Sequence, residues 1–394
     1  MHSSDLLREA DRCVKCGICL PHCPTYKLTR DEGDSPRGRI SLIQALASGQ
    51  LSSTETQYHL DRCLTCLACE ASCPSGVRYH ELIDQARSIR DKRSRLAQIS
   101  HSLIAKLPYH KASRFALWLY RFSGVRYLLR AVAGRQFRRL DDLIPTHAKV
   151  GHWRRDYPAT SAQQGRVGLF TGCAGRISDR LALDAAISVL NRLGFEVVIP
   201  TQQGCCGALH QHAGDSETAL IYSQQNQAAF GRDNLDAVLY VASGCGAQLN
   251  QQRFSVPTWE ISHFINSCNW PPEVTLNPLP YRIGLNTPCS LKHSLKLDDQ
   301  PPLLLNRIPE IDLTPLTQID CCGAAGSYLL EQPTLSDALR DKAMATFKPA
   351  ELDFLATSNS GCALQLASGL RKTNKNLRVV HPIELIAMSM SQTD

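Results

Sequence analysis

The sequence contains no long apolar run and no common motif of a nucleotide-binding or hydrolytic enzyme. None of its apolar stretches approaches the ~20 residues that a membrane-spanning helix needs, and the opening residues, MHSSDLLREADRC, lack an apolar signal segment. We find no G-x-G-x-x-G after a predicted strand, no P-loop and no nucleophile elbow. We therefore expect a cytoplasmic chain without a hydride-handling site of its own.

Acidic residues are scarce in one part of the chain. The stretch from Arg87 to Arg155 holds seventeen Lys or Arg residues but only three Asp, although the whole chain has a net charge of +7. Phe115, Trp118 and Leu119 recur there at helical spacing among arginines. Such a helix packs on its own domain, fills a partner's groove or lies on a membrane surface. We expect no nucleic-acid binding, because no recognition motif accompanies the basic residues.

Cysteine, in contrast, is abundant, with 17 in 394 residues. Clustered cysteines in a reducing compartment predict metal ligands or redox groups rather than disulfides. The run CVKCGICLPHCP, Cys13 to Pro24, returns as CLTCLACEASCP, Cys63 to Pro74. This C-x₂-C-x₂-C-x₃-C-P spacing is typical of bacterial ferredoxins that hold two [4Fe–4S] clusters, and it fits the paired spacing of zinc sites poorly.

In such ferredoxins the fourth cysteine of each run serves the other cluster. The first predicted cluster therefore has the ligands Cys13, Cys16, Cys19 and Cys73, and the second has Cys63, Cys66, Cys69 and Cys23. We expect Pro24 and Pro74 to begin helices. Positive side chains beside the cysteines would raise the cluster potentials unless they are simply solvated, and the candidates are Arg12, Lys15, Arg62 and Arg78.

A second duplication fills the remainder of the chain. Each copy has one cysteine after a β-branched run, a Cys-Cys-Gly 32 residues later and a final cysteine. Strand and helix patterns alternate, which predicts a parallel sheet with these cysteines near the carboxyl ends of its strands. The two predicted thiol groups are Cys173, Cys205, Cys206 and Cys245 in one copy, and Cys289, Cys321, Cys322 and Cys362 in the other.

This tandem C…CCG…C pattern resembles the cysteine-rich CCG domains of heterodisulfide reductase-type proteins. A tandem ferredoxin followed by two such domains resembles the iron–sulfur subunits of glycolate oxidase, a bacterial flavin-linked 2-hydroxyacid dehydrogenase. The stretches SPRGRI, HLDRCLTC, CPSGVRYH and CCGAAGSY carry the resemblance beyond the cysteines. It implies a complex that oxidises glycolate or D-lactate, in which flavoprotein subunits carry FAD and this chain passes electrons toward quinone, with an inner-membrane surface as a further contact.

The sequence departs from the heterodisulfide reductase pattern at one position in each copy. The last cysteine of that pattern belongs to a C-x-x-C pair, whereas Gln248 and Gln365 stand at the partner positions here. We leave open whether the CCG thiols bind a further cluster, another metal or nothing. Two alternative functions also stay open: thiol–disulfide chemistry at the CCG sites, and the iron–sulfur subunit of an anaerobic glycerol-3-phosphate dehydrogenase.

The predicted architecture is therefore multidomain. Residues 1–90 form a helical tandem [4Fe–4S] ferredoxin, and residues 91–165 form a basic helical linker. Residues 166–280 and 281–394 form two tandem α/β CCG domains. His210, His212 and His293 lie near the CCG cysteines, where we expect packed or surface histidines rather than ligands, and Cys268 has no counterpart in the repeat.

Overall fold

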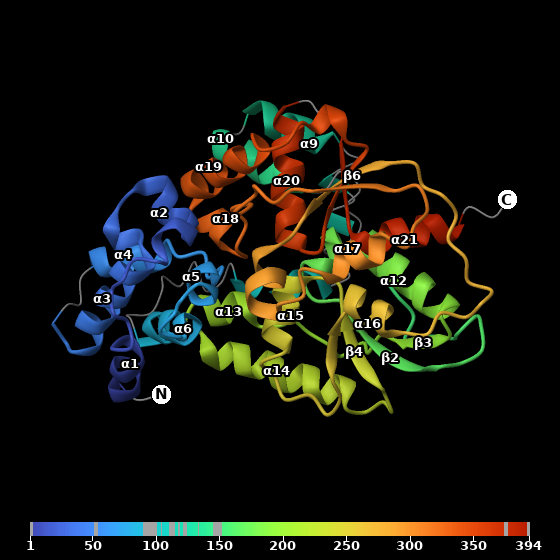
Figure 1. Ribbon diagram of the computed structural model, residues 1–394, viewed down its shortest axis with the longest axis horizontal. Helices are drawn as coiled ribbons and strands as arrows, with labels where there is room; N and C mark the ends of the chain where they lie inside the picture. Colours follow the sequence, from blue (N-terminus) through green and yellow to red (C-terminus); the bar gives the residue numbers. More distant parts are fainter. Residues whose placement is uncertain are drawn as a thin grey trace.

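The computed structural model describes residues 3–50, 54–89, 101–103, 105–109, 115–116, 119–120, 124–132, 134–144, 152–373 and 377–391. An N-terminal helical block lies beside two α/β domains, which together form the larger part of the chain (Figure 1). Much of the predicted basic linker lies outside the described residues, including Trp118 and Phe122.

The N-terminal block is helical, as its sequence predicts. It comprises α1 (Ser3–Ala10), α2 (Pro24–Thr29), α3 (Pro36–Ala47), α4 (Thr54–Asp61), α5 (Ala68–Ala71) and α6 (Tyr79–Ile89). The side chain of Ser35 accepts a hydrogen bond from the Gly38 N–H and caps α3, whose first residue is a proline. Leu6, Ile43 and Leu82 are fully buried where these helices meet. The block thus has a small apolar core of its own.

Only one of the two prolines after the cysteine runs begins a helix. Pro24 is the first residue of α2, but Pro74 lies in a turn and α6 begins at Tyr79, so that prediction was wrong. Gly76 has a left-handed φ of 61°, and the Glu9 carboxylate accepts a 2.7 Å hydrogen bond from the Arg78 N–H. These two features hold the chain extended before α6, because a left-handed residue and a side-chain-bound N–H both interrupt helix formation.

The first α/β domain contains a five-stranded sheet in the order β1-β3-β2-β4-β5. Its strands are β1 (Asp156–Tyr157), β2 (Gly165–Phe170), β3 (Phe195–Val198), β4 (Ala237–Tyr240) and β5 (Thr258–Glu260). All neighbours are parallel except β1, which pairs antiparallel with β3 at the edge. Its helices are α11 (Gly175–Ser178), α12 (Arg180–Arg192), α13 (Ala208–His212), α14 (Ser216–Phe230), α15 (Ser243–Leu249) and α16 (Ile261–Ser267).

The second α/β domain repeats this strand order without the antiparallel edge. Its parallel sheet runs β7-β6-β8-β9, with β6 (Arg282–Asn286), β7 (Asp312–Pro315), β8 (Phe354–Thr357) and β9 (Arg378–Val380). Its helices are α17 (Gln300–Leu305), α18 (Tyr328–Glu331), α19 (Pro333–Met344), α20 (Ser360–Lys372) and α21 (Pro382–Ser391). The internal repeat that the cysteine spacing predicts is therefore also a repeat of the fold.

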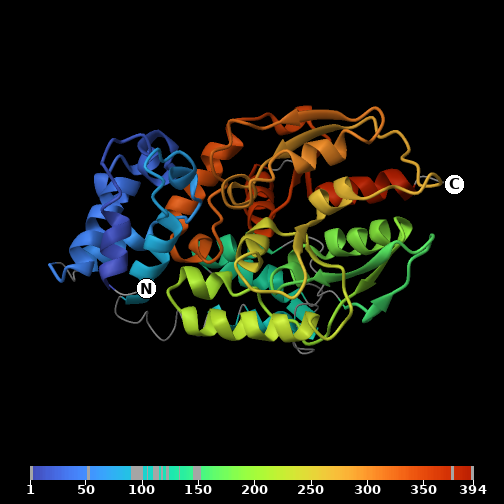
Figure 2. The ribbon, with the colours of Figure 1, turned by 60° about the horizontal axis from the view of Figure 1, so that its bottom comes forward.

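One apolar core joins the two sheets. Buried residues of both domains belong to it, among them Leu190 on α12, Ile283 on β6 and Ile386 on α21. Helices α12 and α21 lie side by side between the sheets (Figure 2). The two copies thus stabilise each other, because each covers apolar surface of the other.

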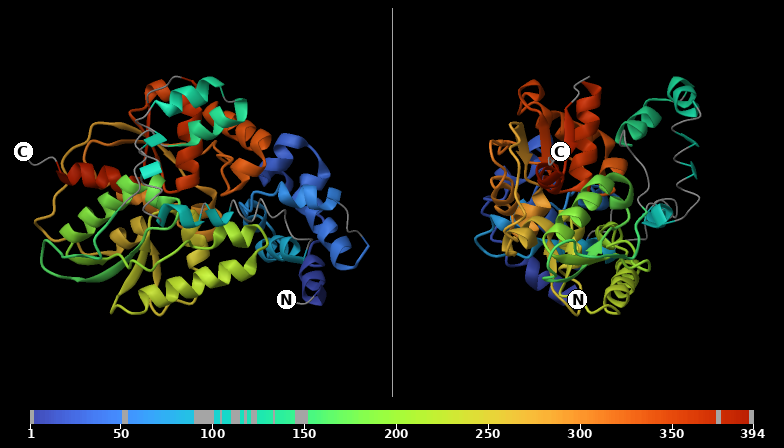
Figure 3. Two further views of the ribbon diagram at one scale, coloured as in Figure 1. Left: turned by 180° about the vertical axis from the view of Figure 1, so that it is seen from behind. Right: turned by 90° about the vertical axis from the view of Figure 1, so that its right-hand side faces the viewer.

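Two helices of the basic region lie on the outside of the second α/β domain (Figure 3). They are α9 (Val125–Val132) and α10 (Arg135–Leu143). The buried carboxylate of Asp141 accepts hydrogen bonds from Arg126 of α9, and Arg139 forms a 3.0 Å ion pair with Asp337 of α19. Part of the positive charge predicted for this region is therefore paired with carboxylates of the same chain. The apolar or aromatic side chains of Tyr127, Leu128 and Val132 remain exposed. Across the described ranges, every helix is too short or too polar to span a bilayer.

His381 joins the two α/β domains in its neutral form. Its Nε2 lies 2.9 Å from the Val241 carbonyl oxygen, and its Nδ1 lies 3.1 Å from the Ile383 N–H. One ring nitrogen therefore donates while the other accepts, which suits an uncharged imidazole. Burial accordingly lowers the pKa of His381 to about 4.

We predict that His381→Gln reduces the acid sensitivity of folding. A depressed folded-state pKa stabilises the protein above the unfolded value near 6.5, and this stability is lost as the pH falls toward 4. Between pH 7 and pH 5 the wild-type chain should lose about 2 kcal/mol more unfolding free energy than the variant does. Denaturant titrations at both pH values measure this difference. Parallel losses in the two proteins would contradict the neutral-histidine contact.

Candidate functional site

The two cysteine loops of the N-terminal block share one backbone conformation. In the first loop Lys15 and Gly17 have left-handed φ values of 57° and 85°, and in the second Thr65 and Leu67 have values of 50° and 60°. These positions correspond in the repeat, two and four residues after the first cysteine. Left-handed conformations cost side-chain-bearing residues about 1 kcal/mol or more and persist where the surrounding structure enforces them. In both loops these left-handed residues lie between successive cysteines, so the two loops repeat one turn geometry.

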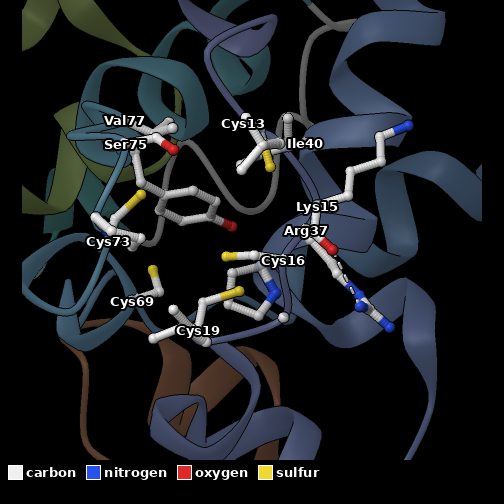
Figure 4. A pocket seen from close by; sticks show the side chains of 16 residues that line it. Cys13, Lys15, Cys16, Cys19, Arg37, Ile40, Cys69, Cys73, Ser75 and Val77 are labelled. Atoms are coloured by element: carbon white, nitrogen blue, oxygen red, sulfur yellow. Dashed lines mark hydrogen bonds between the residues drawn. The ribbon is translucent and has the colours of Figure 1, made fainter.

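Three thiols of the first loop face a cavity together with two thiols from the second loop. Cys13, Cys16, Cys19, Cys69 and Cys73 all line this cavity (Figure 4). Cys16 is exposed, and the adjacent Val14 and Ile18 are 70% and 47% exposed. The outer cavity, as we name this one, therefore opens at the protein surface.

A second cavity lies deeper and shows the reciprocal arrangement. It is lined by Cys63, Cys66 and Cys69 of the second loop and by Cys23 of the first. Cys23, Cys63 and Cys69 are buried and Cys66 is half-buried. This inner cavity brings together the four thiols that the sequence rule grouped for the second cluster.

Polar groups surround the inner cavity. The Tyr79 hydroxyl donates to Cys63 Sγ at 3.7 Å, and the Thr25 hydroxyl lies 3.2 Å from Cys23 Sγ. Arg39, which is 1% exposed, places Nη1 4.0 Å from Cys23 Sγ. Donors aimed at sulfur favour the thiolate form that metal ligation requires.

Three thiols at the two cavities hold their protons more tightly than an ordinary thiol does. Burial raises the pKa of Cys19 to about 11 and raises those of Cys66 and Cys69 well above the usual thiol range. Four uncompensated thiolates at one site would repel one another in a poorly solvated cavity. Occupation by a metal cluster must therefore expel protons and supply the positive charge that balances the sulfurs.

The first CCG domain gathers its four cysteines after the carboxyl ends of β2, β3 and β4, as predicted. Cys173 Sγ lies 3.4 Å from Cys205 Sγ, and this contact is the main cause that raises the pKa of Cys173. Cys206 is buried and lies close to Cys245, which is in the first turn of α15. The four thiols thus form one connected group at the sheet edge.

The second CCG domain repeats this arrangement. Cys322 Sγ lies 2.7 Å from Cys362 Sγ, and the neighbouring Cys321 thiol is the main cause that raises the pKa of Cys289. Cys321, Cys322 and Cys362 are buried, and Cys289 is half-buried. Both predicted CCG thiol groups are therefore brought together by the fold.

The glycine of each CCG motif has two roles. Gly207 and Gly323 have left-handed φ values of 90° and 80°, and their N–H groups donate to the sulfurs of Cys205 and Cys321 at 3.4 and 3.3 Å. A Cβ at Gly323 would lie 2.4 Å from the Ser336 carbonyl oxygen. The glycine thus permits a backbone turn that points an N–H at sulfur.

The inner cavity adjoins the thiols of the second CCG domain. Cys66 packs against a small buried cluster that contains Cys321, Leu64 and Tyr328. The Cys289 thiol is close enough to raise the pKa of Cys66 further after burial has raised it. Lys27 of α2 forms an ion pair with Asp320, and α2 lies beside α19 in Figure 1. The inner-cavity thiols of the N-terminal block therefore lie beside the thiol group of the second CCG domain.

The thiol groups do not form single-ion sites. Four thiolates around one zinc ion lie about 3.8 Å apart, from a Zn–S distance of about 2.3 Å. Within the described ranges, the only group of three His, Cys, Asp or Glu ligand atoms all within 4.8 Å of one another is Asp31, Asp34 and His59. In the CCG domains two thiol pairs lie close together, Cys173 with Cys205 at 3.4 Å and Cys322 with Cys362 at 2.7 Å, but no three described thiols converge as a single zinc ion requires.

Four of the other candidate residues have structural partners. His210 Nδ1 contacts Asp215 at 3.2 Å, and His212 Nδ1 contacts Asp84 at 3.3 Å. The buried Gln365 donates to the Ser336 hydroxyl, and Cys268 Sγ donates to the Phe264 carbonyl oxygen. His293 and Gln248 are half-buried.

Sequence proximity identified only some of the cations near the thiols. Arg78 and Arg12 pair with Glu9, and Arg62 pairs with the buried Asp34. Arg39 and Arg87 were missed, because each lies more than fifteen residues from the nearest cysteine that it approaches. Neither arginine carries a sequence signal of this role, because its burial follows from the packing of α3 or α6 over the cysteine loops.

Comparison with known proteins identifies both regions. A family described as "4Fe-4S dicluster domain" matches residues 9–77, and the "Cysteine-rich domain" family matches residues 167–250 and 283–367. A solved structure of a hypothetical protein from Helicobacter pylori shares the fold, with a TM-score of 0.52 and 11% identity, over 91% of this chain and 68% of that one.

Curated relatives match over nearly the whole chain. The "Probable glycolate oxidase iron-sulfur subunit" of Bacillus subtilis is 31% identical over 96% of this chain and 93% of its own length. The "Glycolate oxidase iron-sulfur subunit" of Escherichia coli is 32% identical, with 96% and 94% covered. The "Lactate utilization protein A" of Geobacillus kaustophilus is 25% identical, with 56% and 98% covered.

The reciprocal cavities predict which cluster each fourth cysteine holds. Cys73→Ser should disturb the cluster of Cys13, Cys16 and Cys19, although Cys73 belongs to the other run. Iron and sulfide assays with low-temperature electron paramagnetic resonance (EPR) of anaerobically purified protein measure this. Cys268→Ser is the matched control and should leave iron content unchanged. Loss of the inner-cavity signal in Cys73→Ser would contradict the assignment.

Proposed function

Because this chain belongs to the family of glycolate oxidase iron–sulfur subunits, we propose that it carries electrons from a flavoprotein partner that oxidises glycolate or a related 2-hydroxyacid. It is an iron–sulfur subunit of the hydroxyacid dehydrogenase type. FAD resides on the partner chain, and quinone is the final acceptor. D-Lactate is the related substrate that the lactate utilization relatives favour.

The observation that carries this proposal is the pair of cavities that the eight N-terminal thiols line. A bound [4Fe–4S] cluster supplies reversible one-electron chemistry at each of them. Cys13, Cys16, Cys19 and Cys73 hold the outer cluster, and Cys63, Cys66, Cys69 and Cys23 hold the inner one. The protein fixes both sites in one rigid block, keeps water from the inner site and leaves the outer site open to a donor.

The CCG domains extend this arrangement. We propose that their thiol groups hold further clusters, which the grouping of four cysteines in each copy and the Gly N–H donors support. Six of the eight CCG thiols are buried. A reaction with a thiol or disulfide substrate would require access that this burial opposes, so we favour electron transfer over heterodisulfide chemistry.

The localisation stays a prediction. We expect a cytoplasmic complex whose basic outer region contacts the flavoprotein subunits or an inner-membrane surface. The exposed Tyr127, Leu128 and Val132 beside the arginines of α9 support such a contact.

Cys66→Ser should separate substrate oxidation from acceptor reduction. In the assembled complex, glycolate should still reduce the flavin of the partner, whereas reduction of a quinone analogue should fall at least ~100-fold, because the inner cluster is lost or converted. Stopped-flow absorbance of the flavin and a quinone-analogue assay measure the two steps. Acceptor reduction at the full rate in Cys66→Ser would refute the relay.

Metal content tests the same proposal without a partner. The anaerobically purified chain should be brown and contain about eight irons if only the two N-terminal clusters are present, and about twelve to sixteen if the CCG sites are filled as well. Colourless protein that contains zinc and no acid-labile sulfide would overturn the proposal. Glycolate oxidation by the chain alone would do the same.

A further inference from the structure

The two N-terminal cavities differ in the charges that surround them. Arg37 and Arg39 lie two residues apart on α3, yet their side chains go to opposite environments. Arg37 lies at the outer cavity, binds Glu32 at 2.6 Å and keeps 32% of its side chain exposed. Arg39 lines the inner cavity and is 1% exposed. Water therefore screens the charge of Arg37 and not that of Arg39.

Arg39 is held in place by four acceptors. Its Nε donates to the His59 carbonyl oxygen at 2.8 Å and its Nη1 to the Thr25 hydroxyl at 3.1 Å. Nη1 also lies 4.0 Å from Cys23 Sγ, and Nη2 lies 3.4 Å from Asp34. These contacts fix a permanent positive charge beside a cluster ligand.

The carboxylate of Asp34 does not neutralise this region. It is shared with Arg62 at 2.8 Å and contacts His59 at 3.0 Å. A third arginine, Arg87, is 4% exposed, and its guanidinium donates hydrogen bonds to the backbone carbonyl oxygens of Leu60, Cys63 and His212. Arg39 and Arg62 thus share one buried carboxylate, and the buried Arg87 guanidinium is bound by backbone carbonyl oxygens.

An excess of buried positive charge is costly unless an anion compensates for it. An oxidised cubane with four thiolate ligands carries two negative charges, and reduction adds a third. The net positive charge of the arginines balances the charge of the oxidised cluster, and it stabilises the more negative reduced cluster still more. Hydrogen bonds to the ligand sulfurs act in the same direction, and Tyr79 donates one to Cys63.

We infer that Arg39, supported by Arg62, Arg87 and Tyr79, sets the reduction potential of the inner cluster above that of the outer cluster. This inference rests on the proposed function and adds the direction of electron transfer to it. Each electron lost by the outer cluster reduces the inner one, no proton moves with it, and the flavin of the partner replaces it. Electrons thus run from the exposed site toward Cys66 and the second CCG domain.

Burial acts against this order, because a low-dielectric surrounding disfavours the more negative reduced cluster. The buried arginines must therefore outweigh the burial of the inner site. Their charge acts over a few ångströms in the same poorly screened interior, which strengthens it relative to the solvent-exposed Arg37. Removing Arg39 should accordingly reveal the opposing effect of burial.

The test is an EPR-monitored redox titration of the full-length protein with clusters in place. The signal that disappears in Cys66→Ala is assigned to the inner cluster. In Arg39→Gln the midpoint potential of this signal should fall while that of the outer cluster stays unchanged. Arg39→Lys should restore part of the shift, because it keeps the charge and loses the fixed geometry. The matched control Arg37→Gln should leave the inner potential unchanged.

Tyr79→Phe provides a milder second variant if Arg39→Gln does not fold, since it removes a single hydroxyl. It should lower the same midpoint by a smaller amount. An inner cluster with a lower potential than the outer one in the wild-type protein would overturn the inference, as would an unchanged inner potential in whichever variants fold. Wild-type protein without clusters would instead refute the proposed function, so the two failures are distinguishable.

Discussion

The central constraint on this molecule is electrostatic: grouped thiols must be kept inside a protein and must carry negative charge when they bind metal. All cysteines except Cys268 belong to one of four such groups. Burial raises the pKa of several of these thiols, Cys19, Cys66 and Cys69 among them, so metal binding needs donors or cations that favour the ligated form. The CCG domains meet this need with the N–H of a left-handed glycine. The inner cavity meets it with buried arginines and a tyrosine hydroxyl.

The crossed assignment of cysteines has a structural consequence beyond metal binding. Cys23 and Cys73 each leave their own run to complete the cavity of the other run. The two loops therefore cannot separate without opening both cavities. A block of six short helices has a small apolar core, and bound clusters would act as cross-links that stabilise it.

The sequence predicted the thiol groups well because their spacing is a property of local geometry. Fixed intervals placed three cysteines on one loop, and the strand pattern placed Cys173 and Cys289 after strands of matching sheets. The cations could not be found in this way. Arg39 approaches Cys23 only because α3 folds back over the first loop, and Arg87 reaches Cys63 from α6. Arginines that are close to the cysteines in sequence, such as Arg78, instead form ion pairs with nearby carboxylates.

Two local features also escaped prediction for reasons of context. Pro74 has the residue type of a helix start, but the Glu9 carboxylate binds the Arg78 N–H and holds the chain extended. The edge strand β1 lies in a polar segment, and its antiparallel pairing follows from contact with β3 rather than from its own two residues. In both cases a partner distant in sequence decides the local structure.

The position of the N-terminal block makes the two CCG copies unequal despite their common fold. It contacts the first copy through Arg87 and Asp84, which bind the His212 backbone and side chain. It contacts the second through Cys66, whose neighbours include Cys289 and Cys321. The first copy thus contacts the block with the backbone and side chain of His212, whereas the second copy contacts it with its thiol group. In the proposed relay, an electron that leaves the inner cavity therefore reaches the second copy before the first.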